Sequence, residues 1–115
     1  MPFADVCGTE QFREIVSDKK MTVVCFSAVW CGPCKTIETD LEKLTYSFPN
    51  IRFAKVDADS NAEIVTKCKV IQLPTFMLVR GGDMLGYVIG ADLPSLNQKI
   101  RSVGTPSELS SERRR

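Results

Sequence analysis

The feature that most constrains this chain is the pentapeptide Trp-Cys-Gly-Pro-Cys at residues 30–34. Two cysteines separated by two residues can close a small disulfide ring, and the glycine and proline between them turn the chain tightly. The preceding residues 23–26 are continuously apolar, which is typical of a buried strand. Apolar residues then recur at intervals of three and four from Cys34 to Phe48, which predicts a helix. The sequence therefore predicts a pair of cysteines at a strand-to-helix junction.

The expected position of Cys31 at the start of this helix favours a reactive thiolate. The first N–H groups of a helix have no intrahelical partner, and together with the helix dipole they stabilise a negative charge. The thiolate is the form of cysteine that attacks a disulfide, and we expect Cys31 to be exposed as well. Cys34, one helical turn further, is then placed to attack the mixed disulfide that Cys31 forms and to release the reduced substrate.

Three later segments extend this pattern: Lys-Val-Asp at residues 55–57, Leu-Pro-Thr at 73–75 and Gly-Ala at 90–91. Together with residues 30–35 they resemble the thioredoxin family in order and spacing, over roughly residues 4–102. A bare Cys-x-x-Cys is weak evidence because zinc sites and haem attachment also use it, whereas Trp-Cys-Gly-Pro-Cys with a later Pro-Thr is specific. The resemblance implies an α/β thioredoxin fold, with a mixed five-stranded sheet flanked by four helices. It also implies a general protein-disulfide reductase, a thiol–disulfide oxidoreductase with a role in cellular redox homeostasis and electron transport.

The resemblance further implies a substrate-binding surface around the cysteines. The family's matching tryptophan covers the site, although a ring such as that of Trp30 can also simply pack. The family's matching proline, here Pro74, is cis and faces the cysteines, although only about one X–Pro bond in twenty is cis in folded proteins. The matching glycine, Gly90, lets a substrate chain approach closely. The whole expected surface is Trp30, Gly32, Pro33, Leu73, Pro74, Thr75 and Gly90.

Cys25 marks a departure from the family. Many thioredoxins have a buried aspartate six positions before the nucleophile, where it is thought to take the proton from the resolving cysteine. A thiol has a much higher reference pKa than a carboxylic acid, so we expect that Cys25 does not serve in the same way near neutral pH. Lys55 is the second supporting residue, because its match in the family lies beneath the active site. By composition alone Lys55 would be interpreted as a surface charge.

Strand and helix signals alternate along the chain and predict one domain over residues 1–103. Helical connections between the first strands predict parallel pairing, and the turn at residues 80–83 predicts an antiparallel hairpin. Residues 104–115 are rich in Ser, Glu and Arg without periodicity, and we expect a flexible polar tail there. The expected strands are residues 4–7, 22–27, 51–57, 75–79 and 84–89, and the expected helices begin near Thr9, Pro33, Ser60 and Asp92.

Three further expectations concern the helices themselves. Thr9 and Asp92 are candidate N-caps, and residues 60–63, Ser-Asn-Ala-Glu, match a capping box. Thr39 stands where many thioredoxins have a proline that kinks the helix, so we expect the helix over residues 33–48 to be straighter than in those relatives.

The net charge and the amino-acid composition of the chain exclude several kinds of binding or catalytic site. The 115-residue chain has a formal net charge of +1, which gives no sign of nucleic-acid binding, and it has no histidine, which excludes Cys–His dyads and histidine zinc ligands. Without a second Cys-x-x-Cys a zinc site is not expected. The resemblance implies that the redox group is the Cys31–Cys34 disulfide and that no bound cofactor is needed. Five cysteines is an odd number for a secreted disulfide scaffold, and Cys7 and Cys68 are expected to be small buried residues.

No apolar run approaches the length of a membrane span, and no signal peptide is recognisable, which favours a cytoplasmic location.

The expected partners are disulfide-containing client proteins and an external reductant, such as thioredoxin reductase or a low-molecular-weight dithiol. A monomer is expected, with no nucleic acid or membrane partner. A thioredoxin-fold oxidase or isomerase is the nearest alternative, but such relatives usually carry a histidine between the cysteines where this chain has Gly32 and Pro33. An interaction module with incidental redox chemistry and a dimer bridged by a metal are the other two alternatives.

Overall fold

The computed structural model of the chain describes residues 2–110 and contains one five-stranded sheet. The strand order is β1-β3-β2-β4-β5; β1 and β2 both pair parallel with β3, whereas β4 pairs antiparallel with β2 and β5. This confirms the predicted mixed sheet, in which the first three strands are parallel and a hairpin supplies the last two. The strands are β1 (Phe3–Asp5), β2 (Thr22–Ser27), β3 (Arg52–Asp57), β4 (Thr75–Arg80) and β5 (Asp83–Ile89).

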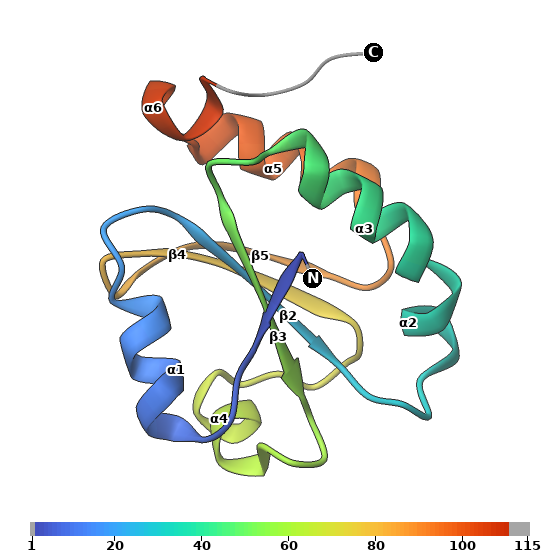
Figure 1. Cartoon of the computed structure of the whole chain (residues 1–115). Helices are drawn as coiled ribbons and strands as arrows, with labels where there is room; N and C mark the ends of the chain where they lie inside the picture. Colours follow the sequence, from blue (N-terminus) through green and yellow to red (C-terminus); the bar gives the residue numbers. More distant parts are fainter. Residues whose placement is uncertain (1, 111–115) are drawn as a thin grey trace.

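Helices cover both faces of the sheet, as Figure 1 shows. Two core clusters lie on opposite faces: one is completed by residues of α3 and α5, and the other by residues of α1 and α4. The described residues thus form an α/β protein with the predicted layers, although with more helical segments than the four expected. The segments are α1 (Thr9–Val16), α2 (Gly32–Thr36), α3 (Glu38–Ser47), α4 (Ala62–Lys67), α5 (Leu93–Val103) and α6 (Pro106–Leu109).

Strand β2 lies at the centre of the sheet and is buried along almost its whole length. Successive side chains of a strand point to opposite faces, so Val23 and Cys25 enter the cluster under α3 and α5. Val24 and Phe26 enter the cluster under α1 and α4. This double burial explains why the strand is continuously apolar instead of alternating, and it makes β2 a rigid base for the cysteines that follow it.

The helix predicted over residues 33–48 is interrupted at Ile37. The backbone of Ile37 has φ −95° and ψ 1°, outside the values of a regular α-helix, and α2 ends before it while α3 begins after it. Hydrogen bonding resumes at once, because the Leu41 N–H donates to the Ile37 carbonyl at 2.7 Å. The partly buried Ile37 side chain packs against the core cluster of α3 and α5. The prediction of one continuous helix over residues 33–48 is therefore wrong: the interruption lies two residues before Thr39 and involves no proline.

The two predicted N-terminal caps of α1 and α4 are also wrong. The N-cap of α1 is Gly8, at φ 90°, and not Thr9. The N-cap of α4 is Asn61 and not Ser60, and Asn61 makes no side-chain cap bond; the Ser60 hydroxyl donates to the Asp57 carboxylate at 2.6 Å. Asn61 instead ties distant segments together: its Oδ1 accepts from the Gly8 N–H, and its Nδ2 donates to the Val6 and Asp57 carbonyls. The longer-range partners of Asn61 thus replace the local capping box.

The hairpin and the last long helix agree with the predictions. Gly81 and Gly82 connect β4 to β5, both with positive φ values of 58° and 82° that glycine accommodates readily. Asp92 caps α5, and its carboxylate accepts the Ser95 N–H at 3.0 Å.

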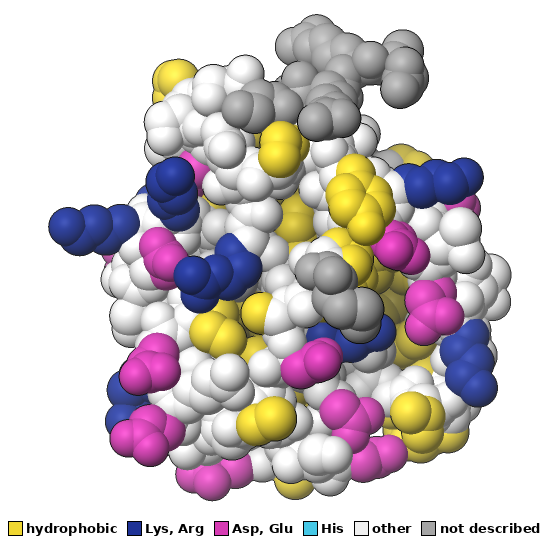
Figure 2. All heavy atoms as spheres, viewed as in Figure 1, with side chains coloured by type: hydrophobic (Ala, Val, Ile, Leu, Met, Phe, Trp, Pro, Cys, Tyr) yellow, Lys and Arg dark blue, Asp and Glu magenta, His cyan; other side chains and the backbone are white. Residues whose placement is uncertain are grey.

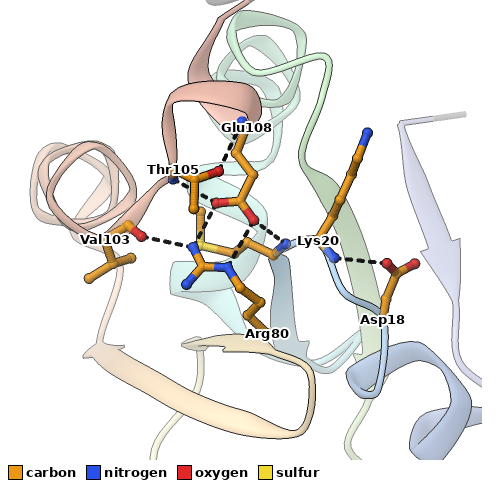
Figure 3. Close-up of polar contacts among 7 residues, drawn as sticks. Asp18, Lys20, Arg80, Val103, Thr105 and Glu108 are labelled. Carbon is orange, nitrogen blue, oxygen red and sulfur yellow. Dashed lines mark hydrogen bonds and ion pairs between the residues drawn. The ribbon is translucent and has the colours of Figure 1, made fainter.

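The segment after α5 is ordered by a buried ion pair, shown in Figure 3. The Arg80 guanidinium donates to the Glu108 carboxylate through Nε at 3.0 Å and Nη2 at 2.6 Å, and Nη2 also donates to the Val103 carbonyl. The same carboxylate accepts the N–H groups of Met21 and Thr105 at 2.7 and 2.8 Å. Because Glu108 is only 2% exposed and lies in α6, the prediction of a flexible polar tail is wrong for residues 105–109. Residues 111–115, which belong to the same prediction, lie outside the described residues.

Candidate active site

Cys31 and Cys34 lie at the junction that the sequence predicts, between β2 and α2. Cys31 is the N-cap of α2, and Pro33 lies in the first turn of that helix. The Cys31 Sγ accepts the Cys34 N–H at 3.3 Å, and the two residues form a disulfide with their Cα atoms 5.3 Å apart. The backbone therefore offers a hydrogen-bond donor directly to the Cys31 sulfur, which favours the charged form of that thiol once the disulfide is reduced.

Cys31 is less exposed than predicted. It is only 4% exposed, whereas Gly32 and Pro33 are exposed and Cys34 is partly exposed. The expectation of an exposed Cys31 is wrong for this disulfide-bonded form, because its sulfur is turned toward the Cys34 N–H and bonded to the Cys34 sulfur.

Trp30 extends from this site instead of packing into the core. Its side chain is 66% exposed, and its indole Nε1 donates to the Asp59 carboxylate at 2.8 Å. Asp59 is a site residue that the sequence analysis missed. A signal was present: Asp59 follows β3, and the carboxyl ends of the neighbouring parallel strands β2 and β3 meet at one edge of the sheet.

The expected cis bond is present between Leu73 and Pro74, directly before β4. The Gly90 N–H donates to the Pro74 carbonyl at 2.8 Å, and Gly90 has a φ of 97°. Thr75 is buried, and its hydroxyl donates to the Gln72 carbonyl at 2.6 Å. The structure thus brings residues 73–75 and Gly90 together, as the spacing of the motifs implies. Leu73 is partly buried against the core cluster of α1 and α4.

A cavity of about 410 Å³ lies behind the cysteines. Cys34 and Pro74 line one part of it, and Phe3 of β1 and Ile37 line another. Figure 2 shows hydrophobic side chains gathered on the face between β1 and helices α2 and α3. The contribution of β1 could not be anticipated from the cysteine motif, because it depends on the pairing of β1 with β3 at the edge of the sheet.

Cys25 and Lys55 lie beside each other on this cavity, in register on the neighbouring strands β2 and β3. Burial raises the pKa of the Cys25 thiol to about 12, and the nearby Lys55 ammonium opposes this rise without reversing it. Cys25 is therefore protonated near neutral pH, as expected. The Lys55 Nζ lies 5.3 Å from the centre of the Phe3 ring. Lys55 and Cys34 line the same cavity.

Cys7 and Cys68 do not line this cavity. Cys7 is exposed, so the expectation that it is buried is wrong, whereas Cys68 is partly buried and packs against the core cluster of α1 and α4. Burial raises the pKa of the Cys68 thiol. Within residues 2–110 no group of three or more His, Cys, Asp or Glu side chains is arranged to hold a metal ion, and no helix has the length and apolar character to cross a membrane.

Comparisons with known proteins point to one family. A family model described as Thioredoxin matches residues 4–102. Thioredoxin-3, mitochondrial, of Saccharomyces cerevisiae is 37% identical over 93 residues, which span 81% of this chain and 73% of that protein. Thioredoxin-1 of Schizosaccharomyces pombe is 34% identical over 97 residues, spanning 84% of this chain and 94% of that protein. The crystal structure of thioredoxin from Trypanosoma brucei brucei has a TM-score of 0.87 and 58% identity, and covers 88% of this chain and 89% of its own.

Proposed function

This chain belongs to the thioredoxin family of thiol–disulfide oxidoreductases, and we propose that Cys31 is its nucleophile and Cys34 its resolving thiol. The chain is a protein-disulfide reductase working by dithiol–disulfide exchange. The observation that carries this assignment is the position of the Cys31 Sγ at the N-cap of α2, facing the Cys34 N–H. An N–H donor and the helix dipole both favour a thiolate at that sulfur. Cys34 lies within disulfide distance and is therefore placed to resolve the intermediate.

The proposed cycle has two exchange steps. The Cys31 thiolate attacks one sulfur of a client disulfide, and the other client sulfur leaves as a thiolate and takes a proton from water. The Cys34 thiolate then attacks the Cys31 sulfur, which breaks its bond to the client and forms the Cys31–Cys34 disulfide. The client gains two electrons and the protein loses two. An external reductant, thioredoxin reductase or a low-molecular-weight dithiol, restores both thiols.

The client is proposed to lie along the surface predicted from the sequence. Support comes from the exposed Trp30, from Pro74 on the same cavity as Cys34, and from the Gly90 N–H bonded to the Pro74 carbonyl. Gly32 and Pro33 are exposed beside the disulfide and Leu73 is partly exposed, whereas the Thr75 side chain is buried. Four exposed hydrophobic side chains lie within or close to these segments in the sequence, which suits an apolar part of a client: Val29, Trp30, Ile71 and Ile89.

The assignment of the cysteines is tested by trapping. With Cys34→Ser, the reaction should stop at the mixed disulfide, so that client proteins remain attached to Cys31 and separate on reduction. With Cys31→Ser, no client should become attached and insulin reduction should not occur. Cys7→Ser is the control: alone it should keep insulin reduction, and combined with Cys34→Ser it should keep trapping. Insulin reduction unaffected by Cys31→Ser would refute the role of Cys31 as the nucleophile. Absence of insulin reduction by the unsubstituted protein would instead indicate an interaction module whose redox chemistry is incidental.

The cellular setting is a separate proposal. We propose a monomer in the cytosol, although a mitochondrial protein is among the relatives. Light scattering of the freshly purified protein, together with metal analysis, would distinguish a monomer from a dimer bridged by a metal. Fractionation of the source cells would show whether the protein is recovered with cytosolic or with mitochondrial markers.

A further inference from the structure

The outer edge of β5 ends beside the active site, and within residues 2–110 no strand pairs with it. We propose that residues 86–89 of β5 and Lys99 of α5 form a second binding site for clients, called here the edge site. It takes an extended segment of the client in which apolar and acidic side chains alternate. This inference rests on the proposed function, because the segment flanks the disulfide that Cys31 attacks.

The hydrogen-bond pattern of the hairpin leaves backbone groups of β5 available. The Gly90 N–H donates to the Pro74 carbonyl at 2.8 Å, and the strand register places these two residues opposite each other. Opposite residues of an antiparallel pair alternate between hydrogen-bonded and non-hydrogen-bonded positions. The N–H and C=O groups of Tyr87 and Ile89 therefore point away from β4, toward the side on which the described part of the chain places no strand.

This stretch lacks the features that usually protect a sheet edge from pairing. Charged side chains, proline and bulges are the common protection, whereas residues 86–89 are Gly-Tyr-Val-Ile. The irregularity in the hairpin register lies beyond Gly86, at Leu78 and Val79 of β4. An incoming strand can therefore bond to this stretch through its backbone, at the usual strand separation of about 4.8 Å.

Lys99 places a positive charge at this edge. A Cβ atom on Gly86 would lie 3.1 Å from the Lys99 Cε and 3.4 Å from its Nζ, so the lysine side chain crosses β5 where Gly86 has none. Lys99 makes no ion pair with any described residue. The carboxylate of Asp92, which lines the same cleft, already accepts the N–H and hydroxyl of Ser95. A client side chain opposite Gly86 has its Cβ about 4.5–5.5 Å away, so a Glu or Asp there reaches the Lys99 ammonium.

The two faces of this edge differ in polarity, which defines the pattern of the client segment. A cleft of about 500 Å³ lies between β5 and α5, within the size range of ligand sites. Val88 belongs to the core cluster under α3 and α5, so Tyr87 and Ile89 point to the other face, where Ile89 is 59% exposed. The α5 wall of the cleft is polar and consists of Ser95, Gln98, Lys99 and Ser102. A strand bound here therefore turns acidic or polar side chains toward α5 and apolar side chains toward Ile89.

The edge site is continuous with the active site. β5 ends at Ile89, directly before Gly90, whose N–H bonds to Pro74. Gly86 precedes Gly90 by four positions, which is about 13 Å in an extended strand. A client segment that continues from the attacked cysteine along β5 thus brings a side chain about four to six residues away to Lys99. Clients with an acidic side chain at that separation should be reduced faster than those without it.

The first test measures binding without redox chemistry. Full-length protein with Cys31→Ser and Cys34→Ser is titrated into a short labelled peptide in which Ser and Val alternate and Glu replaces the central Ser. Fluorescence anisotropy gives the dissociation constant. Lys99→Met should weaken binding about three- to fivefold, as loss of a partly exposed ion pair does, and should leave binding of the Gln-containing peptide unchanged. The matched control, Lys43→Met, removes an exposed cation from α3 and should change neither.

The second test asks whether the peptide binds as a strand. Alternate N–H groups of an added strand face β5, so two peptides are compared that carry N-methyl groups either on the Val residues or on the Ser and Glu residues. One of them should bind more than about tenfold more weakly, because each lost backbone hydrogen bond reduces affinity, and the other should keep its affinity. Equal binding by the two methylated peptides would overturn the edge site. This comparison needs no substitution in the protein.

The third test connects the edge site to reduction. The Glu and Gln peptides receive a cysteine at either end, about five residues from the variable position, as a mixed disulfide with coloured thionitrobenzoate. In a background of Cys7→Ser and Cys68→Ser, Lys99→Met should slow thionitrobenzoate release about three- to fivefold from one of the two Glu peptides. Release from the Gln peptides and from dithiobis(nitrobenzoate), which has no peptide chain, should not change. Release from both Glu peptides that is unaffected by Lys99→Met would overturn the edge site and leave the proposed function intact. Absence of release in the background protein would instead refute the role of Cys31.

Discussion

Cys25 and Cys31 lie on the same strand-to-helix segment, yet their surroundings give their thiols different reactivity. Cys25 is enclosed in β2, where burial raises its pKa to about 12. Cys31 is the N-cap of α2, and its sulfur accepts the backbone N–H of Cys34. At the scale of single residues, the backbone N–H donor at Cys31 is therefore the feature that favours it over Cys25 as the proposed nucleophile.

This contrast predicts an order of alkylation in the reduced protein. With a pKa of about 12, Cys25 has only about one thiolate in a hundred thousand molecules at pH 7. Brief treatment with iodoacetamide near neutral pH should modify Cys31 first and leave Cys25 unmodified until the protein is unfolded. Peptide mapping checks both statements, and the exposed Cys7 serves as the internal reference for an ordinary thiol. Modification of Cys7 or Cys25 ahead of Cys31 would contradict the assignment of the nucleophile.

At the scale of elements, the ends of helices are held by contacts from distant segments. Asn61 is 6% exposed and joins the start of α4 to Gly8 before α1. It also donates to the carbonyls of Val6, directly after β1, and of Asp57, the last residue of β3. One side chain thereby joins the ends of β1 and β3 to the starts of α1 and α4, whereas a capping box would have stabilised α4 alone.

Asn61→Ala should accordingly destabilise the fold. It removes three hydrogen bonds and leaves buried backbone groups without partners, so we expect the free energy of unfolding to fall by about 2–4 kcal/mol. Urea unfolding followed by circular dichroism measures the change. The control is Asn97→Ala on α5, whose side chain accepts one exposed hydrogen bond from Arg101, and its effect should stay within about 0.5 kcal/mol. Equal effects of the two substitutions would show that the Asn61 contacts do not stabilise the junction.

At the scale of the whole molecule, the Arg80–Glu108 pair joins the end of the chain to the sheet. Its carboxylate binds Arg80 at the end of β4 and the Met21 N–H at the start of β2, 87 residues earlier in the sequence. Burial alone would raise the pKa of Glu108, but the hydrogen bonds from Arg80, Thr105 and Met21 outweigh it and lower the pKa to about 2. The segment after residue 103 thus packs on the sheet as far as the end of α6. The family match ends at residue 102 and therefore does not include Glu108.

The direction of the Glu108 shift gives its pH dependence. Because the pKa is lower in the folded state than the ordinary value of 4.5, the ionised carboxylate contributes stability above about pH 4.5, and this contribution is lost as the pH falls toward 2. Glu108→Gln should lower the free energy of unfolding at pH 7 by about 2–4 kcal/mol, because the Arg80 guanidinium then loses its charged partner. Urea unfolding from pH 7 to pH 2.5 should show the difference from the unsubstituted protein shrinking below pH 4.5.

The matched control for this prediction is Glu42→Gln on the exposed side of α3. Its stability at pH 7 should stay within about 0.5 kcal/mol of that of the unsubstituted protein. A Glu108→Gln effect that is independent of pH would show that the contribution of Glu108 does not come from its charge.

Short-range patterns in the sequence determined the chemistry of this protein and most of its fold. The pentapeptide at residues 30–34 follows an apolar run and precedes a helical period, so the local signals place two cysteines at a helix start. The hairpin glycines and the Asp92 cap are equally local, because each depends on residues within a few positions. The family resemblance added the cis bond before Pro74 and the position of Lys55, which no local signal contains.

The tertiary structure alone decided the features that join distant parts of the chain. The break at Ile37, the low exposure of Cys31, the Trp30–Asp59 hydrogen bond and the contact between Phe3 and Lys55 arise when elements pack. The Glu108 carboxylate is the clearest case, because Ser-, Glu- and Arg-rich sequence resembles a solvated tail until Arg80 and the Met21 N–H are placed beside it. Periodicity and capping signals extend over a few residues only, whereas burial and pKa depend on every group that folding brings within contact.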